Sequence, residues 1–101
     1  MNFKVIVSEQ AARDLDGIYS YIYRELKSKS SAERVALQLR GAMTGLSIMP
    51  KRYRVYPLEP WLSREVRSVS VGNYVMFYLV KEAEVWITRI VYGKRNMKKA
   101  L

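Results

Sequence analysis

The sequence predicts an α+β fold with three parts. A short N-terminal strand comes first, then an antiparallel hairpin of two helices, and then an antiparallel sheet of three to four strands packed on the helices. Apolar residues recur at helical spacing through the first half of the chain, and runs rich in β-branched and aromatic residues fill most of the second half. The 101 residues contain no internal repeat and no long linker. We therefore expect a single domain over residues 1–101.

The first two elements are expected to be a strand and a helix. Residues 3–7 form a short β-branched run, which favours a strand. Ser8 can cap the helix that follows, and Glu9 would lie favourably in its first turn. Apolar residues then recur at intervals of three or four and form one stripe, which consists of Ala11, Leu15, Ile18, Ile22 and Leu26. The stripe predicts an amphipathic helix of about five turns.

The second helix is expected to begin after the polar segment of residues 27–31. Ser30 and Glu33 have the spacing of a capping box. The apolar spacing then continues until Pro50, which ends the helix. Its stripe consists of Val35, Leu39, Ala42, Leu46 and Met49. We expect both stripes to be buried against the later strands, which offer the only large apolar face.

The second half is expected to form an antiparallel meander. Residues 51–57 are basic and aromatic, and they are interpreted as a loop that becomes an edge strand ending at Pro57. Strands are predicted at residues 64–71, 74–80 and 85–92, with turns at residues 72–73 and 81–84. One face of this sheet should pack on the helices, and the other should be partly open. Val66 is out of phase with Val69 and Val71, which predicts either a bulge near Arg67 or an exposed valine.

The composition excludes several kinds of site. The chain has no cysteine and no histidine, so it has no disulfide, no thiolate or imidazole metal ligand and no cysteine nucleophile. Its carboxylates are few and scattered, and we expect neither a metal nor a cofactor. No run approaches the roughly 20 apolar residues of a membrane span, and the N-terminal run is too short for a signal peptide. We expect a cytoplasmic protein with no membrane partner.

The positive charge is concentrated in the second half of the chain. Residues 1–50 hold seven Lys or Arg against five Asp or Glu, a net charge of +2, whereas residues 51–101 hold eleven against four, a net charge of +7. This asymmetry indicates an anionic partner such as RNA, DNA or an acidic protein segment. The alternative is a surface that charge merely keeps solvated.

Arginine and tyrosine side chains of the sheet are the candidates for chemistry. The open face and one edge are expected to gather Arg64, Arg67, Arg89, Lys94 and Arg95, with Tyr74, Tyr78 and Tyr92 nearby in sequence. Arginine can stabilise the added negative charge of a phosphoryl transition state, and RNA supplies its own 2′-hydroxyl nucleophile, so a metal-free ribonuclease could be built from such residues. Simple electrostatic docking would use the same residues, and both readings stay open.

Three side chains of the strand half are interpreted as structural. Arg89 shares the phase of the apolar residues Val85 and Ile87, so we interpret it as an arginine that snorkels or pairs with a carboxylate. Trp61 and Trp86 are interpreted as packing residues rather than stacking platforms.

Three segments of the chain resemble the RelE/ParE superfamily of bacterial toxins. They are residues 5–15 with Ile18 and residues 21–22, then residues 66–78, and then residues 90–96. The resemblance implies a growth inhibitor that its cognate antitoxin holds silent in a hetero-oligomer. RelE-like toxins cut messenger RNA in the ribosome, and ParE-like toxins block DNA gyrase. An acidic amphipathic antitoxin segment should bind the groove between helices and sheet or the basic sheet edge.

The match to the RelE-like branch is incomplete. Arg95 stands where RelE-like enzymes keep a phosphate-stabilising arginine, but Val75 stands after Tyr74 where another arginine is usual. The tyrosine expected beyond Arg95 is missing, and no histidine can replace it. Residues 71–78 and the short C-terminus look more ParE-like. The resemblance therefore implies a toxin that binds gyrase.

The two branches imply different roles for the basic residues. The candidate contacts of a gyrase-binding toxin are Arg64, Arg67, Lys94, Arg95, Lys98 and Lys99. The alternative is a metal-independent, ribosome-dependent endoribonuclease, in which Arg67 and Arg95 stabilise the transition state and Tyr92 or a basic residue of 51–54 completes the site. An inactive toxin relative and a small nucleic-acid-binding module are further alternatives.

Overall fold

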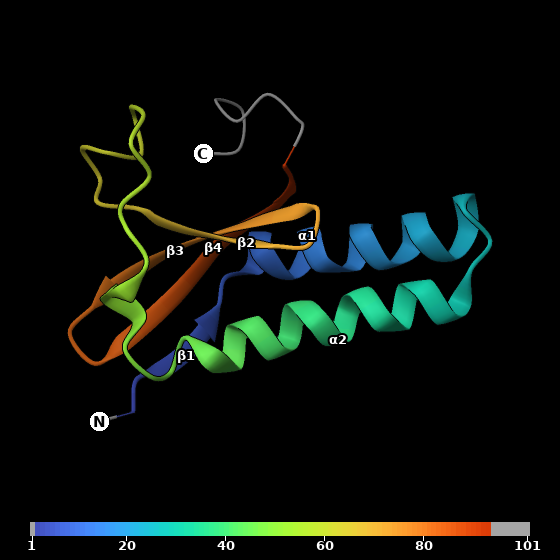
Figure 1. Cartoon of the computed structure of the whole chain (residues 1–101), viewed down its shortest axis with the longest axis horizontal. Coiled ribbons are helices and arrows are strands. Elements are labelled where there is room, and N and C mark those ends of the chain that lie inside the picture. The colour runs from blue at the N-terminus through green and yellow to red at the C-terminus, as the bar shows by residue number, and fades with distance from the viewer. Residues whose placement is uncertain (1, 94–101) are drawn as a thin grey trace.

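The structure, a computed structural model, describes residues 2–93 of the 101-residue chain. Helices lie on one face of a four-stranded sheet (Figure 1), which confirms the predicted α+β class. The elements are β1 (Lys4–Val7), α1 (Glu9–Ser20), the π-helix η1 (Tyr21–Glu25), α2 (Lys29–Gly45), the 3-10 helix η2 (Pro50–Arg52), β2 (Arg67–Val71), β3 (Tyr74–Lys81) and β4 (Glu84–Tyr92). No helix in the described part is long and apolar enough to cross a membrane.

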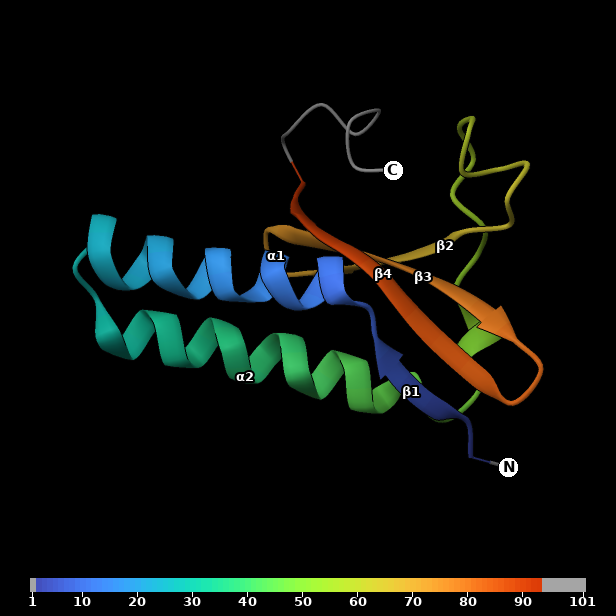
Figure 2. The same ribbon diagram turned by 180° about the vertical axis from the view of Figure 1, so that it is seen from behind.

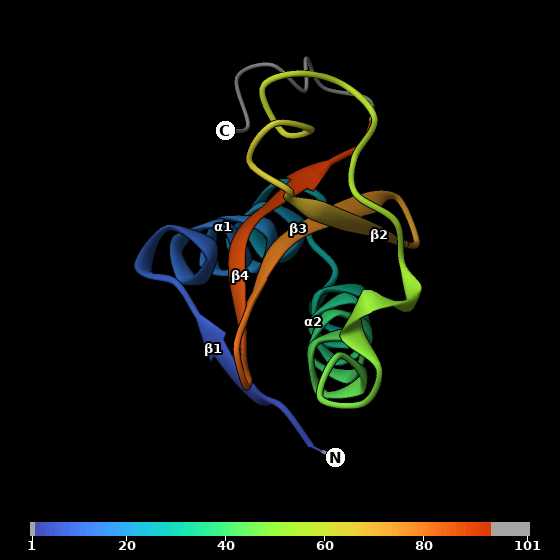
Figure 3. The same cartoon turned by 90° about the vertical axis from the view of Figure 1, so that its left-hand side faces the viewer.

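The sheet has the strand order β1-β4-β3-β2. The last three strands form the predicted antiparallel meander. β1 joins it at the edge, parallel to β4, with Val5 opposite Val85. This pairing joins the first strand to the last one and places α1, which follows β1 directly, beside β4 (Figure 3).

The first helix begins as predicted, at Ser8, whose hydroxyl oxygen accepts a hydrogen bond of 3.0 Å from the Ala11 amide. α1 runs directly into the π-helix η1. A π-helical turn holds more residues than an α-helical turn, so the apolar stripe leaves the core at this point. Ile22 is buried, but Leu26 is 58% exposed, and its assignment to the buried stripe was wrong.

The boundaries of the second helix differ from the prediction. Ser28, not Ser30, caps α2, and its hydroxyl oxygen accepts from the Ser31 amide at 3.2 Å. The helix ends at Gly45 rather than at Pro50. Met49, expected in the buried stripe, is 67% exposed and has a φ of 50°, because the chain reverses there before entering η2.

Three predictions for residues 51–71 were wrong. The strand begins at Arg67 rather than at residue 64, since Glu65 has a φ of 57° and breaks the extended conformation. Residues 51–57 form no edge strand; their described backbone pairing with the sheet is an isolated bridge between Val55 and Arg67. Val66 is neither exposed nor next to a bulge, because it is buried on the face of the sheet opposite the helices.

The one register shift of the sheet lies in β4. Phe77 of β3 faces Arg89 and Tyr78 faces Ile87, which leaves Thr88 as the extra residue of a β-bulge. The Thr88 hydroxyl donates to the Phe77 carbonyl oxygen at 3.2 Å. Because of this bulge, Ile87 and Ile90 both point toward the helices although they are three positions apart.

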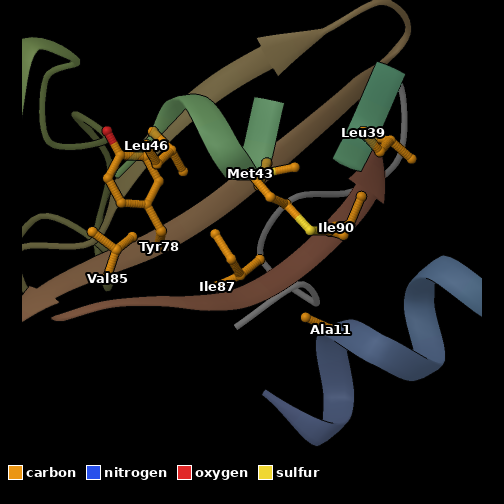
Figure 4. Close-up of a cluster of buried hydrophobic side chains, with 9 residues drawn as sticks. Ala11, Leu39, Met43, Leu46, Tyr78, Val85, Ile87 and Ile90 are labelled. Atoms are coloured by element: carbon orange, nitrogen blue, oxygen red, sulfur yellow. The ribbon is translucent and has the colours of Figure 1, made fainter. Parts of the chain in front are cut away.

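Two apolar clusters lie on opposite faces of the sheet. The main core joins both helices to β3 and β4 (Figure 4). Its fully buried members include Leu39 and Leu46 of α2 and Tyr78 of β3. On the other face, Trp61 stacks on Phe77 with their ring centroids 5.6 Å apart, and Tyr56 meets both rings edge-on. The loop between η2 and β2 thus covers part of the face expected to be open.

The helix hairpin extends beyond the sheet (Figure 2). The half of the hairpin nearest β1 packs on the strands, whereas the half that carries η1 and the start of α2 projects past them. On this projecting half Ile22 is buried, whereas the side chains of Tyr21 and Leu26 are exposed.

Candidate functional site

A groove of about 880 Å³ lies between the projecting half of the hairpin and the end of the sheet where β3 begins and β4 ends. Residues of α1, η1, α2, β3 and β4 line it, and we call it the hairpin groove. Its lining residues are Arg13, Asp14, Gly17, Ile18, Tyr21, Ile22, Leu26, Ser31, Arg34, Val35, Asn73, Tyr74, Arg89, Ile90, Val91 and Tyr92.

An ion pair links helix to sheet at this groove. Asp14 of α1 accepts from the Nε of Arg89 at 2.8 Å and from its NH2 at 3.2 Å. The same carboxylate accepts from the Ile90 amide at 2.9 Å. The Asp14 side chain is 10% exposed and that of Arg89 is 24% exposed. The interpretation of Arg89 as a carboxylate-paired arginine is therefore confirmed, and the bulge at Thr88 explains how it leaves the apolar phase.

The groove combines apolar walls with an excess of positive charge. Ile18, Ile22 and Val35 provide aliphatic surface, and the exposed side chains of Tyr21 and Leu26 extend it. Its charged lining comprises three arginines and one aspartate, namely Arg13, Arg34, Arg89 and Asp14. An amphipathic segment with acidic side chains matches such a surface in both apolarity and charge.

A second group of functional candidates surrounds η2. The guanidinium of Arg67 donates to the carbonyl oxygen of Tyr53 at 2.6 Å and to that of Lys51 at 3.3 Å. The side chains of Lys51, Arg52 and Arg54 are exposed. We call residues 51–54 together with Arg67 the basic loop. Arg67 holds the backbone of this loop, and the neighbouring cations face solvent.

Tyr78 fixes the start of the basic loop from the core. Its place in the fold was not predicted from the sequence; it is fully buried against α2. Its hydroxyl donates to the Pro50 carbonyl oxygen at 2.7 Å. Burial raises the pKa of Tyr78 to about 12, and the nearby positive charge of Arg67 opposes this rise. A neutral phenol held in this way is a structural donor rather than a proton carrier at neutral pH.

The predicted site residues do not gather in one place. Tyr92 lines the hairpin groove, where its ring meets that of Tyr74 edge-on at 5.8 Å. Arg67 pairs with Tyr78, four residues farther along β3 than Tyr74, the partner of Tyr92. That offset is about 13 Å along the strands, with about 10 Å more across them. Arg64 is exposed in the loop before β2. Lys94, Arg95, Lys98 and Lys99 lie outside the described residues.

Four groove residues were not singled out from the sequence. Arg13, Asp14, Arg34 and Asn73 all line the hairpin groove. A signal for Asp14 was present, because it lies three residues after Ala11 and four before Ile18, within the apolar stripe of the first helix. A carboxylate on a buried helix face needs a partner. Among residues 2–93, no group of three or more acidic side chains is arranged to hold a metal ion.

One family model matches most of the chain, and solved structures are similar to it in fold. The family model described as "ParE toxin of type II toxin-antitoxin system, parDE" matches residues 5–97. A solved structure of the chromosomal ParDE toxin–antitoxin system from P. aeruginosa is similar in fold, with a TM-score of 0.74 and 22% identity over 89% of this chain and 95% of that one. A copper-bound mutant toxin from Helicobacter pylori has a TM-score of 0.48 and 19% identity, over 89% of this chain and 93% of that one. No curated protein matches the sequence.

Proposed function

The chain belongs to the ParE toxin family of type II toxin-antitoxin systems, and from this premise we propose that it arrests growth in the bacterial cytoplasm by binding DNA gyrase. As a toxin of such a system it has an antitoxin as its partner. We propose which protein the toxin targets and which of its surfaces binds the antitoxin.

The antitoxin is proposed to bind the hairpin groove. A continuous antitoxin segment would place apolar side chains against Ile18, Ile22 and Val35, and its carboxylates near Arg13 and Arg34. Charge complementarity of this kind raises the association rate, and apolar burial slows dissociation. The result is a hetero-oligomer in which the toxin is silent.

The observation that carries binding rather than catalysis is the separation of Arg67 from Tyr92. The guanidinium of Arg67 donates hydrogen bonds to the carbonyl oxygens of Lys51 and Tyr53, whereas Tyr92 lies at the hairpin groove. A transition-state site needs its donors within about 3 Å of one reacting group. The described candidates do not share such a point, which supports a toxin that acts by occupying a surface of its target.

The test is to induce the toxin alone in bacteria and to follow two readouts over minutes. Altered plasmid supercoiling or trapped DNA breaks, with intact messenger RNA, is expected. New messenger ends at codon-spaced positions with unchanged DNA topology would reject gyrase as the target. Growth arrest with neither change would point to another target, and normal growth to an inactive relative.

A second candidate function is the ribosome-dependent endoribonuclease. The observation in its favour is the basic loop itself, because Arg67 lies against Lys51 and Tyr53 and several exposed cations surround it. In this proposal Arg67 and Arg95 would contact the scissile phosphate, and a basic residue of 51–54 would assist proton transfer. Arg95→Ala should then abolish messenger cleavage without loss of the fold. Cleavage that persists in this variant would exclude the proposed role of Arg95.

A further inference from the structure

A shallow hollow lies on the sheet face opposite the helices, near the turn that joins β3 to β4. Its volume is about 360 Å³, and its lining residues are Leu79, Lys81, Glu84, Trp86 and Thr88. Leu79 also packs against the second cluster, beside Trp61 and Phe77. The hollow therefore continues the apolar surface of this face past the edge of the covering loop, and it is separate from the hairpin groove.

The edge strand β1 adds one residue to each of two rows of side chains at the hollow. Ile6 pairs with Trp86, which pairs with Leu79, so three apolar residues from three strands lie side by side. Lys4 pairs with Glu84, which pairs with Lys81, and this makes a parallel charged row. Partners in register project from the same face of a sheet. We call these six residues the Trp86 surface.

The indole of Trp86 is held in place at the surface. Its ring N–H donates to the Glu84 carboxylate at 3.1 Å. Trp86 is half-buried, whereas Trp61, the other tryptophan, is 1% exposed within the second cluster. A fixed, partly exposed tryptophan next to aliphatic side chains is typical of the centre of a protein–protein interface. Trp86 belongs to neither of the two buried apolar clusters.

We propose that the Trp86 surface is where the protein target of the toxin docks, and that the target presents an apolar side chain flanked by carboxylates. This inference rests on the proposed function, since it assigns the antitoxin and the target to different faces. The apolar side chain enters the hollow beside Trp86 and Leu79, and the carboxylates meet the exposed ammonium groups of Lys4 and Lys81.

The apolar row and the two exposed lysines of this surface favour an acidic protein segment over the other occupants. A second copy of the chain would carry the same net charge of +9, so two copies repel each other. A nucleic acid makes most of its contacts through phosphate and sugar, and it would leave the aliphatic side chains of Ile6 and Leu79 uncovered. An acidic protein segment can pair with the two lysines while its apolar residue covers the indole and shields it from water.

The experiment reverses the two lysines in the full chain. The double variant Lys4→Glu with Lys81→Glu is induced in bacteria and is also co-expressed with the cognate antitoxin. We expect growth arrest to weaken at least about tenfold, counted as surviving colonies, while the antitoxin still co-purifies with the variant. The matched control is Arg24→Glu with Arg40→Glu, which changes net charge equally at exposed helix positions outside the hollow and should still arrest growth.

Each outcome supports or overturns the inference. Full growth arrest by the lysine variant would overturn the inference and leave the proposed function standing. An equal loss of growth arrest in the control pair would also overturn the inference, because it would show that the net charge alone matters. A wild-type chain that does not arrest growth would reject the proposed function, and the inference with it. If the reversal next to Glu84 prevents antitoxin co-purification, the pair Lys4→Gln and Lys81→Gln is used instead and is expected to show a smaller loss in the same direction.

A photo-crosslink identifies the occupant. A benzoylphenylalanine at position 81 is expected to crosslink to purified gyrase, and one at position 37, which is 68% exposed on α2, is not. Crosslinks from position 37 alone would overturn the proposal. Crosslinks from position 81 to the DNA of the gyrase complex, without a protein adduct, would assign the surface to nucleic acid and would overturn it as well.

Discussion

At the scale of single residues, the carboxylate of Asp14 connects the first helix to the sheet. It accepts hydrogen bonds from both Arg89 and the Ile90 amide, so it joins α1 to the strand that follows the bulge. Asp14→Ala would leave a partly buried guanidinium and a main-chain amide without this acceptor. We expect a loss of about 2–3 kcal/mol in the free energy of unfolding, measured by urea denaturation.

The matched control for Asp14 is another carboxylate of the same helix. Glu9 pairs with Arg13 at 2.7 Å, but both side chains are well exposed. Glu9→Ala removes this exposed pair and a first-turn carboxylate, and it should lower the free energy of unfolding by no more than about 1 kcal/mol. Equal losses in the two variants would contradict the structural role assigned to the Asp14–Arg89 pair.

Tyr78 predicts a dependence of stability on pH. Tyr78→Phe removes the buried hydrogen bond to Pro50 and should cost about 1 kcal/mol at neutral pH. Because burial raises the pKa of Tyr78 from 10.0 in the unfolded chain to about 12, the stability that its neutral hydroxyl contributes is complete below pH 10 and is lost as the pH rises toward 12. Urea denaturation between pH 8 and pH 12 should show the wild-type advantage over Tyr78→Phe declining only above pH 10. An advantage that stays constant to pH 12 would refute the raised pKa.

The sequence predicted a residue's role when that role follows from its charge. It did not predict which face of a strand a side chain occupies. The pairing of Arg89 with a carboxylate followed from the cost of burying a lone charge, and it is confirmed. The burial of Tyr78 was not predicted, because a phenol in a strand carries no sign of which face it occupies. The bulge at Thr88 has no signal in the sequence either, since no glycine or proline marks it.

At the scale of elements, the start of α2 offers a direct choice between two serines. Ser28 accepts a hydrogen bond from the Ser31 amide, whereas Ser30 lies inside the helix and is exposed. Ser28→Ala should lower the free energy of unfolding by about 1 kcal/mol, and Ser30→Ala should leave it almost unchanged. Thermal denaturation of the two variants checks this. A larger loss for Ser30→Ala would restore the capping box with Glu33.

The element order was predictable because each element carries its own period. The helical stripes and the β-rich runs led to the correct order of one strand, two helices and a meander. The predicted end of the second helix and the predicted start of β2 were wrong. Met49 and Glu65, which lie at these places, have a positive φ although neither is glycine or asparagine. The parallel pairing of β1 with β4 was not predicted either, because it joins residues about eighty positions apart with no local signal.

The loop of residues 53–66 shows why tertiary packing is hardest to predict. Its first part, up to Pro57, was predicted to become an edge strand, and Trp61 was interpreted as a packing residue without an identified partner. The structure instead places Trp61 against Phe77, and a second small core forms on the sheet face that was expected to be partly open. The packing interpretation of Trp61 is confirmed, but its partner could not be identified from the sequence, since the two rings meet only after the chain folds back over β3.

At the scale of the whole molecule, the sheet separates two surfaces of different character. The hairpin groove lies on the helix side and carries three arginines, whereas the Trp86 surface lies on the other side and carries two lysines around an indole. A toxin with separate surfaces for antitoxin and target can be silenced in two ways. The antitoxin can either cover the target surface as it wraps around, or hold the toxin in a complex too large for the target to accept.

The electrostatic part of antitoxin binding gives the last prediction. Arg34 and Arg40 are both exposed on α2, but only Arg34 lines the hairpin groove. Arg34→Glu should raise the Kd for the cognate antitoxin at least about tenfold, a change of about 1.4 kcal/mol, because it places a carboxylate opposite the acidic segment. Arg40→Glu changes net charge equally and should raise the Kd far less. The Kd measured between 50 and 500 mM salt should rise less steeply for Arg34→Glu than for wild type, since salt screens an attraction that this variant has lost. Equal effects of the two substitutions would mean that the antitoxin responds to the overall charge of +9 and not to the groove.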